Sequence, residues 1–194
     1  MTSAPSALAA AVVAEATARS VRIAVAESLT GGLLAAEIVG VPGASLAFSG
    51  GIVAYDTAVK HSLLGVDAGV LAERGPVDAD VARQMARGVR IACALPGQMV
   101  PATGGARADA SVGVGAAPVI ADLGVSTTGV AGPDPDPQTG QPAGTVWIGV
   151  SSPAGDRAIE LQLAGSRAEI REATVEHALR AMLTVLRAAV FPQS

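Results

Sequence analysis

The sequence predicts an α/β protein, a three-layer α/β/α sandwich around one mostly parallel or mixed sheet. Three observations support this fold class. Segments of helical composition stand near both ends of the 194-residue chain, short apolar segments lie between them, and two of these run into glycine-bearing turns. Strands and helices in this order bury one sheet between two helical layers. The chain shows no internal repeat, so we expect one domain over residues 1–194.

The first half of the chain is predicted to alternate between helices and strands. A Ser-Gly-Gly break inside the second strand indicates a β-bulge or a close backbone approach. Asp56 follows this strand and can cap a short helix that carries Lys60. The elements expected are a helix at 6–18, a strand at 21–26, a helix at 33–39, a turn at 41–45 and a strand at 46–54.

In the second half, Gly75-Pro76-Val77-Asp78 ends one element and caps a helix that continues through Leu95. The segment from about 96 to 121 is rich in Gly, Ala and Pro without a clear period, which predicts an insertion or flexible loop. Ser166-Arg167-Ala168-Glu169 forms a capping box that opens a last helix, ending near Ala189. The strands expected between them are 123–128, 145–151 and 158–163.

Composition excludes several classes of protein. The net charge of −4 argues against a nucleic-acid surface, and 2% aromatic residues provide no platform for unpaired bases. Cys93 is the single cysteine, so no disulfide forms within the chain and a reducing compartment is expected. No apolar stretch reaches the roughly 18 residues of a membrane span, and the first residues make a poor signal peptide. We therefore expect a cytoplasmic protein.

Lys60 is the only lysine among 13 basic residues, and it lies five residues after Tyr55, the only tyrosine. Arginine keeps its proton in proteins, whereas a partly buried lysine can become a neutral amine. The retained lysine is therefore a candidate for proton-transfer chemistry. The alternative is that the lysine count fell to one by chance.

Two strands lead into glycine-bearing turns, Glu27-Ser28-Leu29-Thr30-Gly31-Gly32 and Thr127-Thr128-Gly129-Val130-Ala131-Gly132-Pro133. Backbone N–H groups of such turns can approach an anion, although neither turn matches a Walker or dinucleotide-binding motif. Ser28 stands where a hydrolase nucleophile is often placed, but a serine there can equally cap a helix.

A serine nucleophile needs a base, and a Ser–Lys pair suits this chain better than a Ser–His–Asp triad. His61 directly follows Lys60, so the two side chains should face different directions, and His177 lies inside the last helix. Arg167 can clamp a phosphate or carboxylate. Asp134 and Asp136 lack partners at ligand spacing, so we predict neither a metal site nor a cofactor.

Together these segments resemble the C-terminal domain family of the competence-damage protein CinA, which includes stand-alone nicotinamide-nucleotide amidases. The resemblance covers nearly the whole chain apart from the expected insertion, and its motifs follow the family's order. They are Ala26-Glu27-Ser28-Leu29-Thr30-Gly31-Gly32, Pro42-Gly43-Ala44-Ser45, Gly51-Ile52-Val53-Ala54-Tyr55 with Lys60, Gly75-Pro76-Val77, Thr128-Gly129-Val130-Ala131-Gly132-Pro133-Asp134, Gly144-Thr145-Val146-Trp147 and Gly165-Ser166-Arg167.

The resemblance implies hydrolysis of the carboxamide of nicotinamide mononucleotide to nicotinate mononucleotide and ammonia. It implies Ser28 as nucleophile and Lys60 as base, with Tyr55 assisting. The residues expected to contact the substrate are Ser45, Thr128, Arg167 and the turn residues Thr30, Gly31, Gly32, Gly129 and Gly132. We expect the N–H groups around Thr30 to Gly32 to hold the oxyanion.

Two departures from the family pattern bear on substrate affinity. Ser166 stands where the family usually has aspartate, and Asp134-Pro135-Asp136-Pro137 replaces a glycine-rich loop. The expected partners are a small-molecule nucleotide and further copies of the chain, in a homodimer or larger assembly, with no nucleic acid or membrane. A non-catalytic nucleotide-binding module, or an amidase for another small amide, stays open as an alternative.

Overall fold

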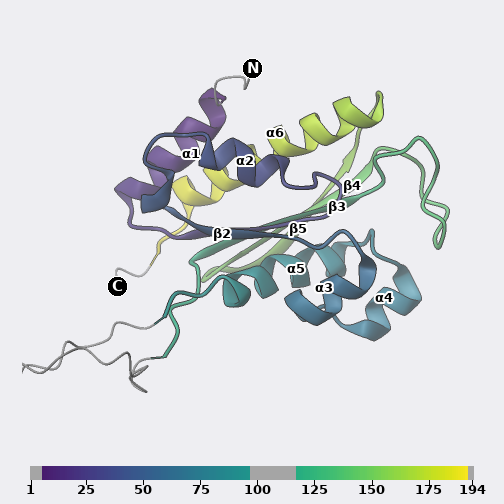
Figure 1. Cartoon of the computed structure of the whole chain (residues 1–194), viewed down its shortest axis with the longest axis horizontal. Coiled ribbons are helices and arrows are strands. Elements are labelled where there is room, and N and C mark those ends of the chain that lie inside the picture. Colours follow the sequence, from purple (N-terminus) through teal and green to yellow (C-terminus); the bar gives the residue numbers. More distant parts are fainter. Residues whose placement is uncertain (1–5, 97–116, 192–194) are drawn as a thin grey trace, which may run out of the picture.

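The computed structural model describes residues 6–96 and 117–191 of the chain. They form one five-stranded sheet in the order β2-β1-β3-β4-β5 (Figure 1). The central strand β1 (Ile23–Glu27) pairs in parallel with β2 (Phe48–Val53) and with β3 (Leu123–Gly129). β4 (Thr145–Ser152) and β5 (Gly155–Gln162) continue the sheet as an antiparallel hairpin. The sheet is therefore mixed, within the predicted fold class.

Helices cover both faces of the sheet, which confirms the three-layer prediction. On one face lie α1 (Ala7–Ala18), α2 (Leu33–Val39) and the long α6 (Arg167–Ala188) (Figure 1). The other face carries α3 (Thr57–Leu64), α4 (Ala68–Arg74) and α5 (Ala79–Ala92). A short 3₁₀ turn, η1 (Ala44–Leu46), precedes β2. None of the helices in the described ranges combines the length and apolarity needed to cross a bilayer.

Local sequence signals placed most element boundaries correctly. Asp56 and Asp78 cap α3 and α5 through their side chains, and Ser166 forms the complete capping box with Glu169. A register shift between β1 and β2 falls within the Ser-Gly-Gly break. The helix expected through Leu95 ends at Ala92, because the backbone of Leu95 instead pairs with Val119 through two 2.9 Å hydrogen bonds.

The segment expected as an insertion, about 96–121, lies mostly outside the described residues. The structure describes its final residues, where Ala121 N–H donates to the carbonyl of Arg90 as the chain enters β3.

Two aliphatic cores hold the three layers together. The larger core packs α1, α2 and α6 on the sheet, and the smaller packs α3, α4 and α5 on the opposite face. Val25 of β1 belongs to the first core, whereas Ala24 and Ala26 belong to the second. This alternation is the period of a strand buried on both sides.

Helix α5 lies unusually close to the sheet because glycines remove side chains beneath it. A Cβ added to Gly149 would lie 2.0 Å from the carbonyl oxygen of Ala82, and one added to Gly124 would lie 2.0 Å from that of Ala86. Ser126 Oγ also donates to the Ala82 carbonyl at 2.7 Å. Strands β3 and β4 are thus fixed against α5.

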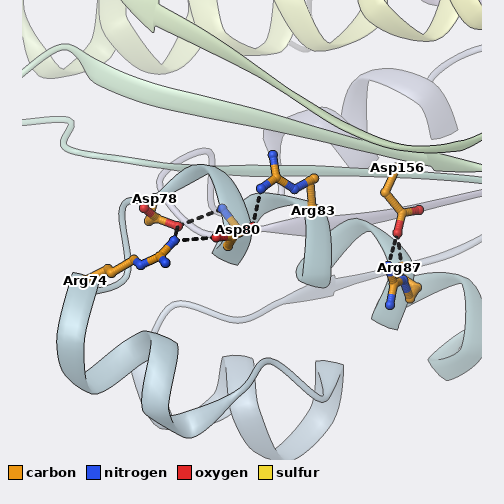
Figure 2. Close-up of polar contacts among 6 residues, drawn as sticks. All are labelled: Arg74, Asp78, Asp80, Arg83, Arg87 and Asp156. Carbon is orange, nitrogen blue, oxygen red and sulfur yellow. Dashed lines mark hydrogen bonds and ion pairs between the residues drawn. The ribbon is translucent and has the colours of Figure 1, made fainter.

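Ion pairs hold α5 at its exposed side (Figure 2). Asp80 accepts from Arg74 of α4 and from Arg83, one turn along α5. Further along the helix, Arg87 pairs with Asp156 at the start of β5. Pairs this exposed stabilise weakly, so the glycine contacts fix the helix position more than the charges do.

The chain changes direction at β1. It leaves β1 through α2 to reach β2 on one side, then returns through α3, α4 and α5 on the other face to β3 (Figure 1). Ligands of open α/β sheets bind at such a switch point, outside the carboxyl ends of the strands. A ligand site is therefore expected at the crevice between the carboxyl ends of β1 and β3.

We expect Gly149→Ala to lower the free energy of unfolding by about 2–3 kcal/mol, because the added methyl group overpacks the contact with Ala82. Urea unfolding followed by circular dichroism measures this difference. A variant as stable as the parent would mean that α5 can move off the sheet at little cost.

Candidate active site

Ser28 directly follows β1 at the switch point. Its N–H donates to the carbonyl of Thr127 at 2.9 Å, which continues the pairing of β1 with β3 by one residue. The chain then turns through Gly31 and Gly32, whose φ angles of 57° and 98° lie in the left-handed region that glycine adopts without steric cost. This turn leads into α2.

Lys60 reaches Ser28 from α3. Thirty-two residues separate them in sequence, yet Lys60 Nζ lies 3.0 Å from Ser28 Oγ. The amine also donates to the carbonyl of Ala54 at 2.9 Å. Lys60 is 1% exposed, and its amine lies against the carbonyl of Ala54, the residue directly after β2. The structure thus brings together the two residues expected to carry chemistry.

Burial changes the protonation of this lysine. Desolvation lowers the pKa of Lys60 from 10.5 to about 8, and the negative charge of Asp56 opposes part of that change. A substantial fraction of the amine is then neutral near pH 8, and a neutral amine can accept a proton.

The turn after Ser28 differs from the expectation in one respect. Gly32 N–H donates to the Glu27 carboxylate at 2.9 Å, as do the N–H groups of Leu34 and Ala35 in the first turn of α2. Gly31 N–H donates to the carbonyl of Ser28. This corrects the prediction that the N–H groups of Gly31 and Gly32 face a substrate, because both are engaged within the protein.

Two other N–H groups of the turn remain available. Among the described residues, no hydrogen bond joins the N–H groups of Leu29 or Thr30 to a protein acceptor. Leu29 directly follows Ser28, the position that supplies one oxyanion donor in α/β-hydrolases, and Thr30 comes next in the same turn. The side chain of Thr30 is fully buried and bonds to Thr127 Oγ1 at 2.7 Å.

A cavity of about 410 Å³ opens in front of Ser28 and Lys60. This volume lies in the range of small-molecule sites. Tyr55, 61% exposed, and Arg167 stand on its wall and are joined by a 3.0 Å hydrogen bond from Arg167 Nη2 to the Tyr55 hydroxyl. The remaining lining residues are Leu29, Thr57, Pro76, Val77, Thr128, Gly129, Ala131, Asp136 and Pro137.

The second glycine turn contributes one wall of this cavity. Thr128 Oγ1 donates to the carbonyl of Pro76 at 2.6 Å, so its proton is directed away from a ligand. Gly129 lies beside Thr128 on the lining. Gly132 contributes its carbonyl oxygen, which accepts from Arg167 Nη1 at 2.8 Å. Gly132 therefore orients Arg167 and does not line the cavity itself.

The position of Ser45 differs from the prediction that it contacts the substrate. It lies in η1, before β2, and its carbonyl accepts from Arg22, which directly precedes β1. Ser45 is thus at the amino-terminal edge of the parallel strands, whereas Ser28 and Lys60 meet at the carboxyl edge. Among the described residues, Ser45 is not one of those that line the cavity in front of Ser28 and Lys60.

The histidines stand outside the site, as their positions in the sequence predicted. His61 is exposed and its Nδ1 lies 2.7 Å from the carbonyl of Val66. His177 is exposed on α6. In ranges 6–96 and 117–191, no three His, Cys, Asp or Glu residues gather in a metal-binding arrangement.

Sequence reasoning missed Arg171, and it considered Asp136 only as a metal ligand and as part of a loop that departs from the family pattern. Arg171 donates from Nε to the carbonyl of Leu29 at 2.8 Å and from Nη2 to that of Thr30 at 3.0 Å. It lies four residues after Arg167 on α6, and this spacing, which puts both on one helix face, is the signal that was available. Asp136 lines the cavity, and its Oδ1 accepts from the backbone and side chain of Thr139.

We expect Lys60→Met to gain stability relative to the parent below pH 8. There the parent's amine is protonated in both states, and burying its charge costs the folded state about 3 kcal/mol. Lost hydrogen bonds to Ser28 and Ala54 offset part of the gain. Between pH 8 and 10.5 only the unfolded parent holds the proton, so the parent's free energy of unfolding rises with pH.

Urea unfolding at pH 7.5 and pH 9.5 measures this linkage. The variant's advantage should shrink by about 2 kcal/mol between the two values. Since the chain has no other lysine, the comparison isolates this amine. An advantage that stays constant with pH would contradict the depressed pKa.

The chain is similar in sequence to proteins of one family. The family model of the CinA C-terminal domain matches residues 5–110 and 106–186. A CinA-like protein of Frankia casuarinae is 44% identical over 161 residues, which cover 83% of this chain and 31% of that protein. A putative competence-damage inducible protein of a Geobacillus species is 39% identical over 86% of this chain. The chain spans about a third of the length of these curated relatives.

Solved structures show the same architecture. The competence/damage inducible protein CihA of Agrobacterium tumefaciens has a TM-score of 0.75 at 27% identity, covering 96% of this chain and 99% of that one. A CinA superfamily protein of Klebsiella pneumoniae has a TM-score of 0.76 at 24% identity, covering 94% and 97%, a likeness of fold. With the family model matched over most of its length, the chain belongs to the CinA C-terminal domain family.

Proposed function

We propose that this chain is a serine amidase that hydrolyses the carboxamide of nicotinamide mononucleotide to nicotinate mononucleotide and ammonia without a cofactor. Ser28 is the nucleophile and Lys60 is the base. The observation that carries the proposal is the 3.0 Å contact between Lys60 Nζ and Ser28 Oγ, made by a buried amine with a pKa of about 8.

The contact suits proton transfer in both directions. The neutral amine accepts the hydroxyl proton of Ser28 while one of its N–H groups stays on the carbonyl of Ala54, which holds the amine in place. Ser28 Oγ then bonds to the amide carbon. When the carbon–nitrogen bond breaks, the Lys60 ammonium donates its proton to the departing nitrogen, which leaves as ammonia. Water, with Lys60 as base again, hydrolyses the acyl ester and frees Ser28.

The negative charge that forms on the amide oxygen needs donors that are already in position. The N–H groups of Leu29 and Thr30 supply them, since no protein acceptor among the described residues engages either one. They lie in the turn that begins at Ser28. Leu29 holds the position directly after the nucleophile that supplies one such donor in α/β-hydrolases, and Thr30 adds a second donor from the same turn.

Nicotinamide mononucleotide carries a negative phosphate and a positive pyridinium ring, and the cavity has a side chain of opposite charge for each. Arg167 donates well to phosphate, and the α6 N-terminus beside it adds a partial positive charge. The carboxylate of Asp136 and the ring face of Tyr55 suit a pyridinium cation. Tyr55 therefore binds substrate in this proposal. Its hydroxyl is hydrogen-bonded to Arg167, and among the described residues it makes no hydrogen bond to Ser28 or Lys60.

We expect Ser28→Ala and Lys60→Arg each to lower ammonia release from nicotinamide mononucleotide by about 10³-fold or more. Ser28→Ala removes the nucleophile, and an arginine at position 60 cannot give up its proton at any working pH. A coupled assay of ammonia, with circular dichroism to verify folding, measures both. We expect the parent to keep its activity in a chelator.

The controls separate the alternatives. In a non-catalytic nucleotide-binding module, Ser28→Ala and Lys60→Arg bind nucleotide as the parent does, and the parent releases no ammonia. In an amidase for another substrate, the parent is silent on nicotinamide mononucleotide but active on a different small amide. Lys60→Arg with near-normal turnover would refute the base assignment.

We expect kcat/KM to rise with pH through a midpoint of about 8, because only the neutral form of Lys60 accepts the Ser28 proton. Asp56→Asn should shift that midpoint to lower pH, since the negative charge of Asp56 holds the pKa of Lys60 up. Asparagine caps a helix as well as aspartate does, so α3 is preserved. A midpoint that does not move, or a profile flat from pH 6.5 to 9.5, would contradict the role of Lys60.

A further inference from the structure

Arg171 is the one guanidinium that the described residues place against the backbone of the Ser28 turn. It projects from α6, where it is half-buried, and its two bonds reach the carbonyls of Leu29 and Thr30, 142 and 141 residues away in sequence. The chemistry proposed above uses no side chain at this position. A guanidinium that binds two successive carbonyls in a fixed fork nevertheless fixes the orientation of two peptide planes.

Peptide planarity carries this orientation to the other side of the turn. In a trans peptide the C=O and the next N–H point in opposite directions. With the Leu29 carbonyl held by Arg171 Nε, the Thr30 N–H must point away from Arg171. The Thr30 carbonyl is held by Nη2, and the Gly31 N–H accordingly points back to the Ser28 carbonyl. That bond in turn directs the Leu29 N–H outward.

Backbone contacts also hold one of these planes, because Leu33 N–H donates to the Thr30 carbonyl at 3.2 Å and Gly31 N–H to the Ser28 carbonyl at 3.1 Å. Among the described residues the Leu29 carbonyl has no backbone donor, so Arg171 Nε alone holds the plane that carries the Thr30 N–H. The Glu27 carboxylate binds the N–H groups of Gly32, Leu34 and Ala35, beyond the turn. Thr30 is held through its side chain at Thr127. A Cβ on Gly31 would lie 3.4 Å from Arg171 Nη2, which shows how closely the guanidinium packs on the turn.

We propose that Arg171 is a positioning residue that aims the N–H groups of Leu29 and Thr30 at the oxyanion formed when Ser28 attacks. The inference rests on the proposed serine chemistry and deepens it. Arg171 contacts neither the substrate nor Ser28 Oγ. It holds directly the carbonyl of the peptide that carries the Thr30 N–H. It acts on the Leu29 N–H indirectly, through the Thr30 carbonyl and the hydrogen bond from Gly31 N–H to the Ser28 carbonyl.

The test compares three variants of the full chain on nicotinamide mononucleotide. Arg171→Met removes both donors, and Arg171→Lys keeps the charge and one donor. Arg180→Met is the matched control, because Arg180 lies on the same helix and bonds only to Glu176 at the surface. We expect Arg171→Met to lower kcat by about 10²-fold, near the loss for one oxyanion donor, with KM little changed. Arg171→Lys should fall in between, and Arg180→Met should match the parent.

Two readouts distinguish positioning from a merely structural role. The pH midpoint of about 8 should persist in Arg171→Met, because the Lys60–Ser28 contact is left in place. Added guanidinium ion at low millimolar concentration should restore part of the lost kcat. A variant with a lower melting temperature but parental kcat would overturn the inference, as would a loss carried by KM alone. If Arg171→Met does not fold, Arg171→Lys carries the test.

A fluorophosphonate probe makes the outcome independent of the substrate. The probe forms a tetrahedral adduct on a reactive serine, and intact mass spectrometry follows its rate. The parent should be labelled and Ser28→Ala should not, while Arg171→Met should react about 10²-fold more slowly. Equal labelling of the parent and Arg171→Met overturns the inference but leaves the serine amidase intact. A parent that is not labelled overturns both, since there is then no nucleophile for the turn to serve.

Discussion

A buried amine held against a serine hydroxyl is the interaction on which the rest of the site depends. Lys60 is 1% exposed, and the fold keeps it there although the charge would be far better solvated outside. The amine is accommodated by two oxygens, Ser28 Oγ and the Ala54 carbonyl, at 3.0 and 2.9 Å. The destabilisation this causes is what lowers the pKa of the group to about 8. Burial of Lys60 thus both destabilises the folded state and lowers the pKa of the amine.

The sheet topology explains why residues so far apart in sequence meet. Ser28 follows β1, Lys60 is on the first helix after β2, and Thr128 is the second-last residue of β3. Three neighbouring parallel strands thus each deliver one group to the same edge. Helix α6 covers that edge from the other face and adds Arg167 and Arg171. On the opposite face of the sheet, the glycines of β3 and β4 let α5 pack closely against these two strands.

Much of this could be read from the sequence, and the exceptions have physical reasons. Lys60 stood out because it is the only lysine, and Ser28 stood out because it lies at the end of a predicted strand. Ser45 was misplaced because its motif precedes a strand, and the site gathers only where strands end. The N–H groups of Gly31 and Gly32 were assigned to a substrate because nothing in the sequence shows that the Glu27 carboxylate and the Ser28 carbonyl already bind them. Arg171 was missed because its partners are backbone carbonyls, which every residue has.

The position of Arg167 and Arg171 on the last helix has a consequence for the life of the chain. The strands that carry Ser28 and Thr128, and the helix that carries Lys60, all leave the ribosome before α6 does. Until α6 packs in place, the turn after Ser28 lacks the hydrogen bonds from Arg171 and the cavity lacks the guanidinium of Arg167. The candidate site is therefore complete only after α6 has been synthesised and has packed against the sheet.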